Sequence, residues 1–183
     1  MTNKKVNGYK MKSKAIEANK ILNDLIGDLV IGTRTIDHLI HPLLSSQVDK
    51  LYKIGITRLC VFHIIITLTK YIEFYKHFKI IIPKDALNQC KDLVNILQKK
   101  QIIEFRNKVV GHIWNNDKNA PITDREHDIL LQHIYGGNYN SFLLWINDQK
   151  DNVFPKTVIS IIENVRKKIA EYYKIDHSEI FRN

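Results

Sequence analysis

Glycine and proline, the residues that interrupt helices and form tight turns, are scarce in this sequence. The chain has 7 glycines and 4 prolines among its 183 residues. A sandwich or barrel of many short strands needs turn residues at regular intervals, and a nucleotide-binding scaffold needs a glycine-rich phosphate loop. Both architectures are therefore disfavoured. The composition favours long, uninterrupted helices.

Apolar residues recur at helical spacing along most of the chain. Between residues 16 and 30 they return every three or four positions and make one face of a helix. The same spacing predicts further helices over about 47–77, 84–110 and 155–173. We therefore expect an all-α fold, a helical bundle of four to five main helices.

The ends and breaks of these helices follow from a few local signals. A Thr-x-x-Glu capping box at Thr123 predicts the start of a short helix, and about 114–124 is expected to be an irregular insertion. Residues 1–14 are rich in lysine and are expected to form a flexible tail. No boundary divides the remainder, so 15–183 is predicted to be one domain.

The longest apolar run, residues 59–69, lies between Arg58 and Lys70 and contains His63. Spanning a bilayer takes about 20 predominantly apolar residues, so this run is predicted to be the central helix of the bundle, and no membrane partner is expected. The lysine-rich start has no apolar segment behind it, so no signal peptide is expected. Cys60 and Cys90 are predicted to be free thiols, which fits a cytoplasmic protein.

The basic balance of the chain points to nucleic acid as a partner. The formal net charge is +9, from 28 basic and 19 acidic residues. Five lysines precede the first acidic residue, Glu17. Lysine outnumbers arginine 22 to 6, which an AT-rich genome also produces, so the alternative is a solvated tail without a partner. Further basic residues surround the motif described next.

The stretch Arg-Asn-Lys-Val-Val-Gly-His, residues 106–112, carries the most specific chemistry. Arg106 is one of only 6 arginines, which suggests a need for a planar, permanently charged fork. Gly111 precedes His112 and loosens the helix there. Because side chains six positions apart on a regular helix point about 120° apart, Arg106 and His112 meet only if the helix relaxes or a second chain contributes one of them.

This motif resembles the signature of the HEPN superfamily (higher eukaryotes and prokaryotes nucleotide-binding). The signature is an arginine, a polar residue, a short spacer and a histidine near the end of the third main helix of a four-to-five-helix bundle. Arg106, Asn107 and His112 match it, with five residues between the arginine and the histidine. The resemblance rests on this motif and on the order of the helices.

The resemblance implies a metal-independent endoribonuclease without a cofactor, acting as a homodimer on RNA. His112 would transfer the proton, Arg106 would hold the scissile phosphate, and Asn107 would orient the phosphate or the imidazole. The expected products are a 2′,3′-cyclic phosphate and a 5′-hydroxyl. We expect a toxin-like or phage-defence effector with an antitoxin or defence partner protein. Some HEPN toxins carry a tyrosine two residues after the histidine that an antitoxin modifies, but Trp114 stands there and has no hydroxyl.

Neighbouring lysines are expected to add attraction to the RNA backbone; they are Lys99, Lys100 and Lys108. The alternative is a catalytically silent helical module that binds RNA or a partner protein. In that case Arg106 pairs with an acid such as Glu104 and His112 caps a helix end. A third hypothesis, a regulator that binds DNA through its tail, has no helix-turn-helix signature.

Other histidines and aromatic residues have structural interpretations. His63 is predicted to be a hydrogen-bonded core residue, and His127 and His133 are predicted to be solvated. A metal site at Asp37, His38 and His41 is disfavoured because no matching ligand pair stands out elsewhere. Four aromatic residues at helical spacing are expected to pack in the core or a dimer interface rather than stack on bases; they are Tyr71, Phe74, Tyr75 and Phe78.

Overall fold

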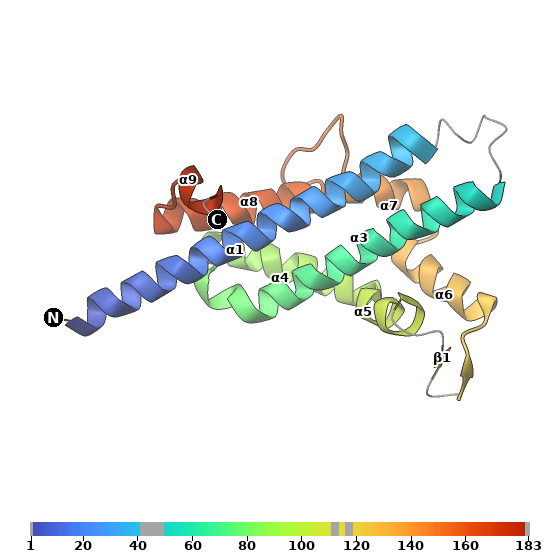
Figure 1. The fold of residues 1–183 in the computed structure, drawn as a ribbon, viewed down its shortest axis with the longest axis horizontal. Coiled ribbons are helices and arrows are strands. Elements are labelled where there is room, and N and C mark those ends of the chain that lie inside the picture. Colours follow the sequence, from blue (N-terminus) through green and yellow to red (C-terminus); the bar gives the residue numbers. More distant parts are fainter. Residues whose placement is uncertain (1, 41–49, 111–113, 116–118, 182–183) are drawn as a thin grey trace.

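The computed structural model describes residues 2–40, 50–110, 114–115 and 119–181. Over these residues the chain is all-α, as predicted, apart from one two-stranded hairpin (Figure 1). The long helices are α1 (Thr2–Thr35), α3 (Lys50–Phe78), α4 (Lys84–Lys99) and α8 (Val158–Tyr173). Shorter helices are α5 (Ile102–Phe105), α6 (Asp124–Tyr135), α7 (Tyr139–Ile146) and α9 (His177–Phe181). Three further turns are η1 (Ile36–Ile40), η2 (Lys79–Ile81) and η3 (Arg106–Val110).

The four long helices make the main bundle. Helices α1 and α3 run antiparallel along the molecule, with α4 and α8 packed behind them (Figure 1). Helix α1 contacts α3 and α8, and α4 contacts the same two helices from the other side. Each long helix therefore has two long neighbours, which gives the closed core that the apolar spacing predicts.

Helix α3 contains the apolar run that was predicted to lie at the centre of the bundle, but like the other long helices it packs against two long neighbours, α1 and α4, so it is not central. By length and composition alone, Leu51–Ile81 could cross a membrane. In the fold, however, Ile64, Ile65 and Leu68 are fully buried against the other helices. These residues contribute to the protein core, whereas Leu51, Ile54 and Leu59 on the same helix are exposed, so packing within the chain accounts for only part of the apolar surface of α3.

The aromatic stripe on α3 packs in the core, as expected. The rings of Tyr71 and Phe74 stack with centroids 6.1 Å apart, and those of Phe74 and Phe78 stack at 5.1 Å. All three side chains are buried, and Tyr75 is half-buried. Burial therefore makes Tyr71, Phe74 and Phe78 unavailable for base stacking.

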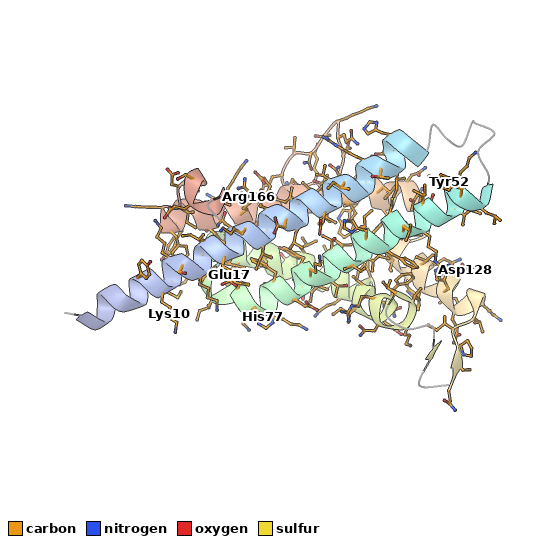
Figure 2. All side chains as sticks on the ribbon, viewed as in Figure 1. Lys10, Glu17, Tyr52, His77, Asp128 and Arg166 are labelled. Carbon is orange, nitrogen blue, oxygen red and sulfur yellow. The ribbon has the colours of Figure 1, made fainter. Side chains whose placement is uncertain are left out.

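Residues 2–14 are the first turns of α1 rather than an irregular tail. Lysine is a good helix former and the segment has no proline, so nothing in it stops the helix. Its inner end is held by an ion pair of 3.0 Å between Lys12 and Glu179, and the Lys14 ammonium lies 5.5 Å from the Phe78 ring centre. The outer turns extend beyond the bundle, and Lys10 is labelled in this part of α1 (Figure 2).

The expected single helix over 84–110 is broken into three pieces. Helix α4 ends at Lys99, and Gln101 adopts a left-handed conformation with φ of 56°. The chain then continues as α5 and as η3, a π-helical turn. The break turns Ile102 and Phe105 inward, where both are fully buried, so tertiary packing outweighs the local preference for one straight helix.

The insertion expected at about 114–124 contains a short antiparallel hairpin. Strand β1 (Trp114–Asn115) pairs with β2 (Ala120–Pro121), and Trp114 lies opposite Pro121. The predicted capping box follows. The Thr123 hydroxyl accepts from the Glu126 amide, and the Glu126 carboxylate accepts from the Thr123 amide at 2.9 Å. The prediction of a helix start at Thr123 is therefore confirmed.

Candidate functional site around Arg106

Arg106 and Asn107 lie at the surface where α5 passes into the π-helical turn η3. Both side chains are exposed, and Arg106 Nη1 donates a hydrogen bond of 2.9 Å to Asn107 Oδ1. The preceding residue, Phe105, is fully buried and packs edge-on against the Phe62 ring of α3, with centroids 5.8 Å apart. The buried side chain of Phe105 thus fixes the backbone immediately before the exposed guanidinium of Arg106.

The turn itself is unusual. A π-helix closes with i→i+5 hydrogen bonds and is rare, and its single turns are frequent at functional sites. The turn η1 (Ile36–Ile40) is a second π-helical turn among the described residues. Here η3 covers the first five residues of the predicted motif, Arg106–Val110. His112 lies outside the described residues, and of Trp114 only the backbone in β1 is described. Of the three residues of the predicted motif, the structure therefore describes Arg106 and Asn107.

Lys100 is held by contacts within the protein, and its role in binding RNA stays a prediction. Its Nζ donates a hydrogen bond of 2.6 Å to the carbonyl oxygen of Ile134, in the last turn of α6. The same ammonium lies 5.3 Å from the ring centre of Trp145 and 5.8 Å from that of Phe142. Burial lowers the pKa of this lysine below its ordinary value. The hydrogen bond from Lys100 to Ile134 joins the end of α4 to the end of α6.

The other two lysines differ from Lys100. Lys108 pairs with Glu104 one helical turn earlier, at 2.8 Å. Glu104 was the acid expected to neutralise Arg106 in the purely structural interpretation, but it pairs with Lys108 instead. Lys99 is exposed on the last turn of α4, and its role in binding RNA stays a prediction.

An open groove of about 430 Å³ lies beside Arg106. It is lined by Gln98, Gln101, Ile103, Glu104, Asn107 and Lys108. A smaller hollow of about 150 Å³ begins at Lys108 and continues along Ile122 and one face of α6. Asn107, which is bonded to Arg106, is therefore also part of the wall of the larger groove.

His127 is a neighbour of the site that sequence reasoning missed. It was predicted to be solvated, which is wrong: its ring centre lies 5.7 Å from that of Phe105 and 6.5 Å from that of Phe62. Its Nε2 is buried and has no hydrogen-bond partner among the described residues, while its Nδ1 lies 3.5 Å from Asp128, labelled on α6 in Figure 2. His127 shares a helical face with Leu130, which was the available signal. His133 is exposed, as predicted.

His63, in contrast, is not the core histidine that was predicted. Its side chain is 42% exposed, and its Nε2 lies 3.7 Å from Asp28 on α1. It lies on the partly exposed side of α3, next to the fully buried Ile64 and Ile65.

The disfavoured metal site remains without support. His38 Nε2 is 3.2 Å from Gln149 Oε1, and Gln149 donates to Asp37 at 3.4 Å; His41 lies outside the described residues. Within the described ranges no group of three or more His, Cys, Asp or Glu side chains could hold a metal ion.

Comparisons with known proteins give a fold but no family. No protein-family model matches the chain, and no curated protein matches it. A solved integron cassette protein from the mobile metagenome of V. paracholerae is similar, with a TM-score of 0.69 and 26% sequence identity. The match covers 86% of this chain and 96% of that one. The chain is therefore similar in fold, over most of its length, to this integron cassette protein.

Proposed function

We propose that the protein is a metal-independent endoribonuclease whose active residues are Arg106, Asn107 and His112. The observation that carries the proposal is the exposed Arg106–Asn107 pair, which begins a π-helical turn and is held in place by the buried Phe105. A guanidinium at the surface of a basic protein, with no acidic partner among the described residues, is suited to bind a phosphate.

The proposed chemistry uses groups that work without a metal. Arg106 holds the scissile phosphate with two parallel hydrogen bonds and stabilises the charge that develops in the transition state. Asn107 keeps the guanidinium in place through its Oδ1. The imidazole of His112 moves the proton between the 2′-hydroxyl, the solvent and the leaving 5′-oxygen. The products are a 2′,3′-cyclic phosphate and a 5′-hydroxyl.

The biological role that we propose is that of a toxin-like or phage-defence effector in the cytoplasm, active as a homodimer and controlled by an antitoxin or defence partner. The similar solved protein comes from a mobile metagenome, and a gene that moves between genomes is a suitable carrier for such an effector. Adenylylation of a tyrosine two residues after His112 is not available as a control, because Trp114 stands there.

The second candidate function is a silent helical module that binds RNA or a protein. The contacts of two lysines near the motif favour it: Lys100 is bonded to a carbonyl of α6, and Lys108 is paired with Glu104. The ion pair with Glu104 neutralises Lys108, and the bond to Ile134 holds the Lys100 ammonium within the protein, so both contacts weaken the attraction that a ribonuclease site would use for its substrate.

The test incubates purified protein with total RNA in excess EDTA. We expect the wild type to cut the RNA and His112→Ala to be inactive, because proton transfer contributes about 10²–10⁴-fold to such reactions. The matched control is His133→Ala, which removes an exposed histidine from α6 and should leave cleavage unchanged. Intact RNA with every protein, together with binding, would establish the silent module. Equal cutting by all three would exclude this motif as the active site.

A second pair of variants tests the arginine. Arg106→Lys keeps the charge but loses the planar fork, so we expect it to slow cleavage nearly as much as Arg106→Ala, by about 10²-fold or more. Arg125→Ala, which removes another exposed arginine, is the control. If Arg106→Lys cleaves as fast as the wild type, bidentate binding of the phosphate is wrong.

A further inference from the structure

The groove beside Arg106 is lined by an unusual number of side-chain amides. Gln98 comes from the last turn of α4, Gln101 from the left-handed corner, and Asn107 from η3. The break in the helix is what brings them to one groove. Carboxamides each carry two donors and an acceptor, so this wall can form specific hydrogen bonds without adding charge.

Most of this hydrogen-bonding capacity is unused. Within the part of the chain that the structure describes, the side-chain amides of Gln98 and Gln101 have no hydrogen-bond partner. Asn107 uses its Oδ1 to accept from Arg106, and its amide nitrogen remains as a donor beside the guanidinium. Three donor groups and two acceptors therefore line the groove and need a partner or water.

The remaining lining favours a flat, uncharged ligand. Ile103 contributes an apolar surface, and the carboxylate of Glu104 is neutralised by Lys108 at 2.8 Å, which weakens its repulsion of an RNA backbone. The volume of about 430 Å³ lies within the roughly 300–1,000 Å³ of sites that hold small molecules. One nucleotide fits these dimensions.

We propose that this groove binds one unpaired nucleobase of the RNA, adjacent to the phosphate at Arg106, and that it prefers adenine. The proposal rests on the function proposed above, because Arg106 places the phosphate next to the groove. Glutamine and asparagine amides pair with adenine through its adjacent N6 donor and N7 acceptor. Adenine offers a second donor–acceptor pair, N6 and N1, on its Watson–Crick edge, so it can satisfy more than one amide.

Binding of uncleavable RNA tests the proposal apart from catalysis. The probes are 2′-O-methylated pentanucleotides, UUAUU, UUCUU, UUGUU and UUUUU, whose blocked 2′-oxygens prevent cleavage, and the readout is the dissociation constant with the full-length protein. We expect UUAUU to bind about tenfold more tightly than the other three, as good amide–adenine pairs discriminate by about that much or more.

Variants of the groove residues test whether the groove causes the preference for adenine. Gln98→Met and Gln101→Met keep the length of the side chain and remove the amide, and each should reduce the preference for adenine by several-fold. Gln132→Met, on an exposed face of α6 outside the groove, should retain it. Gln98 is exposed near a helix end, so this variant should fold even if Gln101→Met does not.

The outcomes separate the two proposals. A preference for adenine that both groove variants lose supports the base site, even if the wild type cuts no RNA. Equal affinities for the four pentanucleotides, or a preference that Gln98→Met leaves intact, overturn the base site. Cleavage that depends on His112 would in that case still stand as the function of the protein.

Discussion

Replacing Lys100 by methionine separates a structural lysine from an RNA-binding one. The two side chains have similar length, so Lys100→Met keeps the apolar contact with Trp145 and Phe142 and removes only the ammonium. What is lost is the 2.6 Å hydrogen bond to the Ile134 carbonyl and the attraction of the cation to two aromatic rings. Ile134 lies in the last turn of α6, where carbonyls have no partner within the helix.

The expected loss of stability in Lys100→Met follows from these contacts. A hydrogen bond from a charged donor contributes about 1.5–3 kcal/mol, and a cation at a helix C-terminus adds about 0.3–1 kcal/mol. The cost of burying the charge opposes them, as the lowered pKa of Lys100 indicates. Because this cost offsets the extra strength that the charge gives the hydrogen bond, we expect Lys100→Met to lower the free energy of unfolding by about 0.5–1.5 kcal/mol, the contribution of an ordinary hydrogen bond.

The assay is urea unfolding, with Lys99→Met as the matched control. Lys99 is exposed on the same turn, so its variant should lie within about 0.5 kcal/mol of the wild type while weakening RNA binding. Equal stabilities for the two variants would refute the structural role of Lys100. A larger loss of RNA affinity in folded Lys100→Met than in Lys99→Met would instead support Lys100 as an RNA-binding residue.

The difference in stability between the wild type and Lys100→Met also depends on pH. Because the folded pKa of Lys100 is lowered from 10.5, the folded state binds fewer protons than the unfolded state in the range just below that value. Stability therefore rises with pH there. The wild type should gain stability relative to Lys100→Met as the pH rises towards 10.5. A constant difference would mean that the ammonium is not desolvated.

Three further changes test the fold around the site. Thr123→Ala removes the cap of α6 and should cost about 1 kcal/mol in urea unfolding, whereas Thr123→Ser should cost much less. Gly136→Ala forces a side chain into a left-handed residue with φ of 64° and should cost about 1–2 kcal/mol by the same assay, with Gly55→Ala, where a Cβ meets no atom within 4 Å, as the control. Burial raises the pKa of the Cys90 thiol to about 11, so iodoacetamide at neutral pH should leave Cys90 unmodified in the folded protein and label it in urea, as mass spectrometry can show.

Sequence patterns predicted the long helices because their burial has a simple period. Core positions on α3 such as Ile64, Leu68 and Ile72 return every four residues, and no residue between them stops the helix. The capping box at Thr123 was equally predictable, because it depends only on two side chains and the backbone between them. Where one face of a helix is buried along its whole length, the spacing of apolar residues and the capping residues were sufficient to predict the helix.

The path of the chain after Lys99 could not be predicted in this way. Gln101 is an ordinary helix former, and nothing local marks it as the residue that adopts a left-handed conformation. The turn is stabilised at a distance, by the burial of Ile102 and Phe105 and by the bond between Lys100 and α6. Such contacts join segments more than thirty residues apart, and a single sequence does not reveal them.

The same break changes the geometric argument about the motif. The separation of about 120° between Arg106 and a side chain six positions later assumes a regular α-helix over the whole interval. Arg106–Val110 is a π-helical turn, in which each residue rotates the chain about the helix axis by a smaller angle than in an α-helix. The angle of about 120° therefore does not apply here. The spacing therefore neither requires nor excludes a second chain. The proposed homodimer rests on the resemblance to the HEPN superfamily, and the same arginine and histidine can be tested in whichever oligomeric state the purified protein adopts.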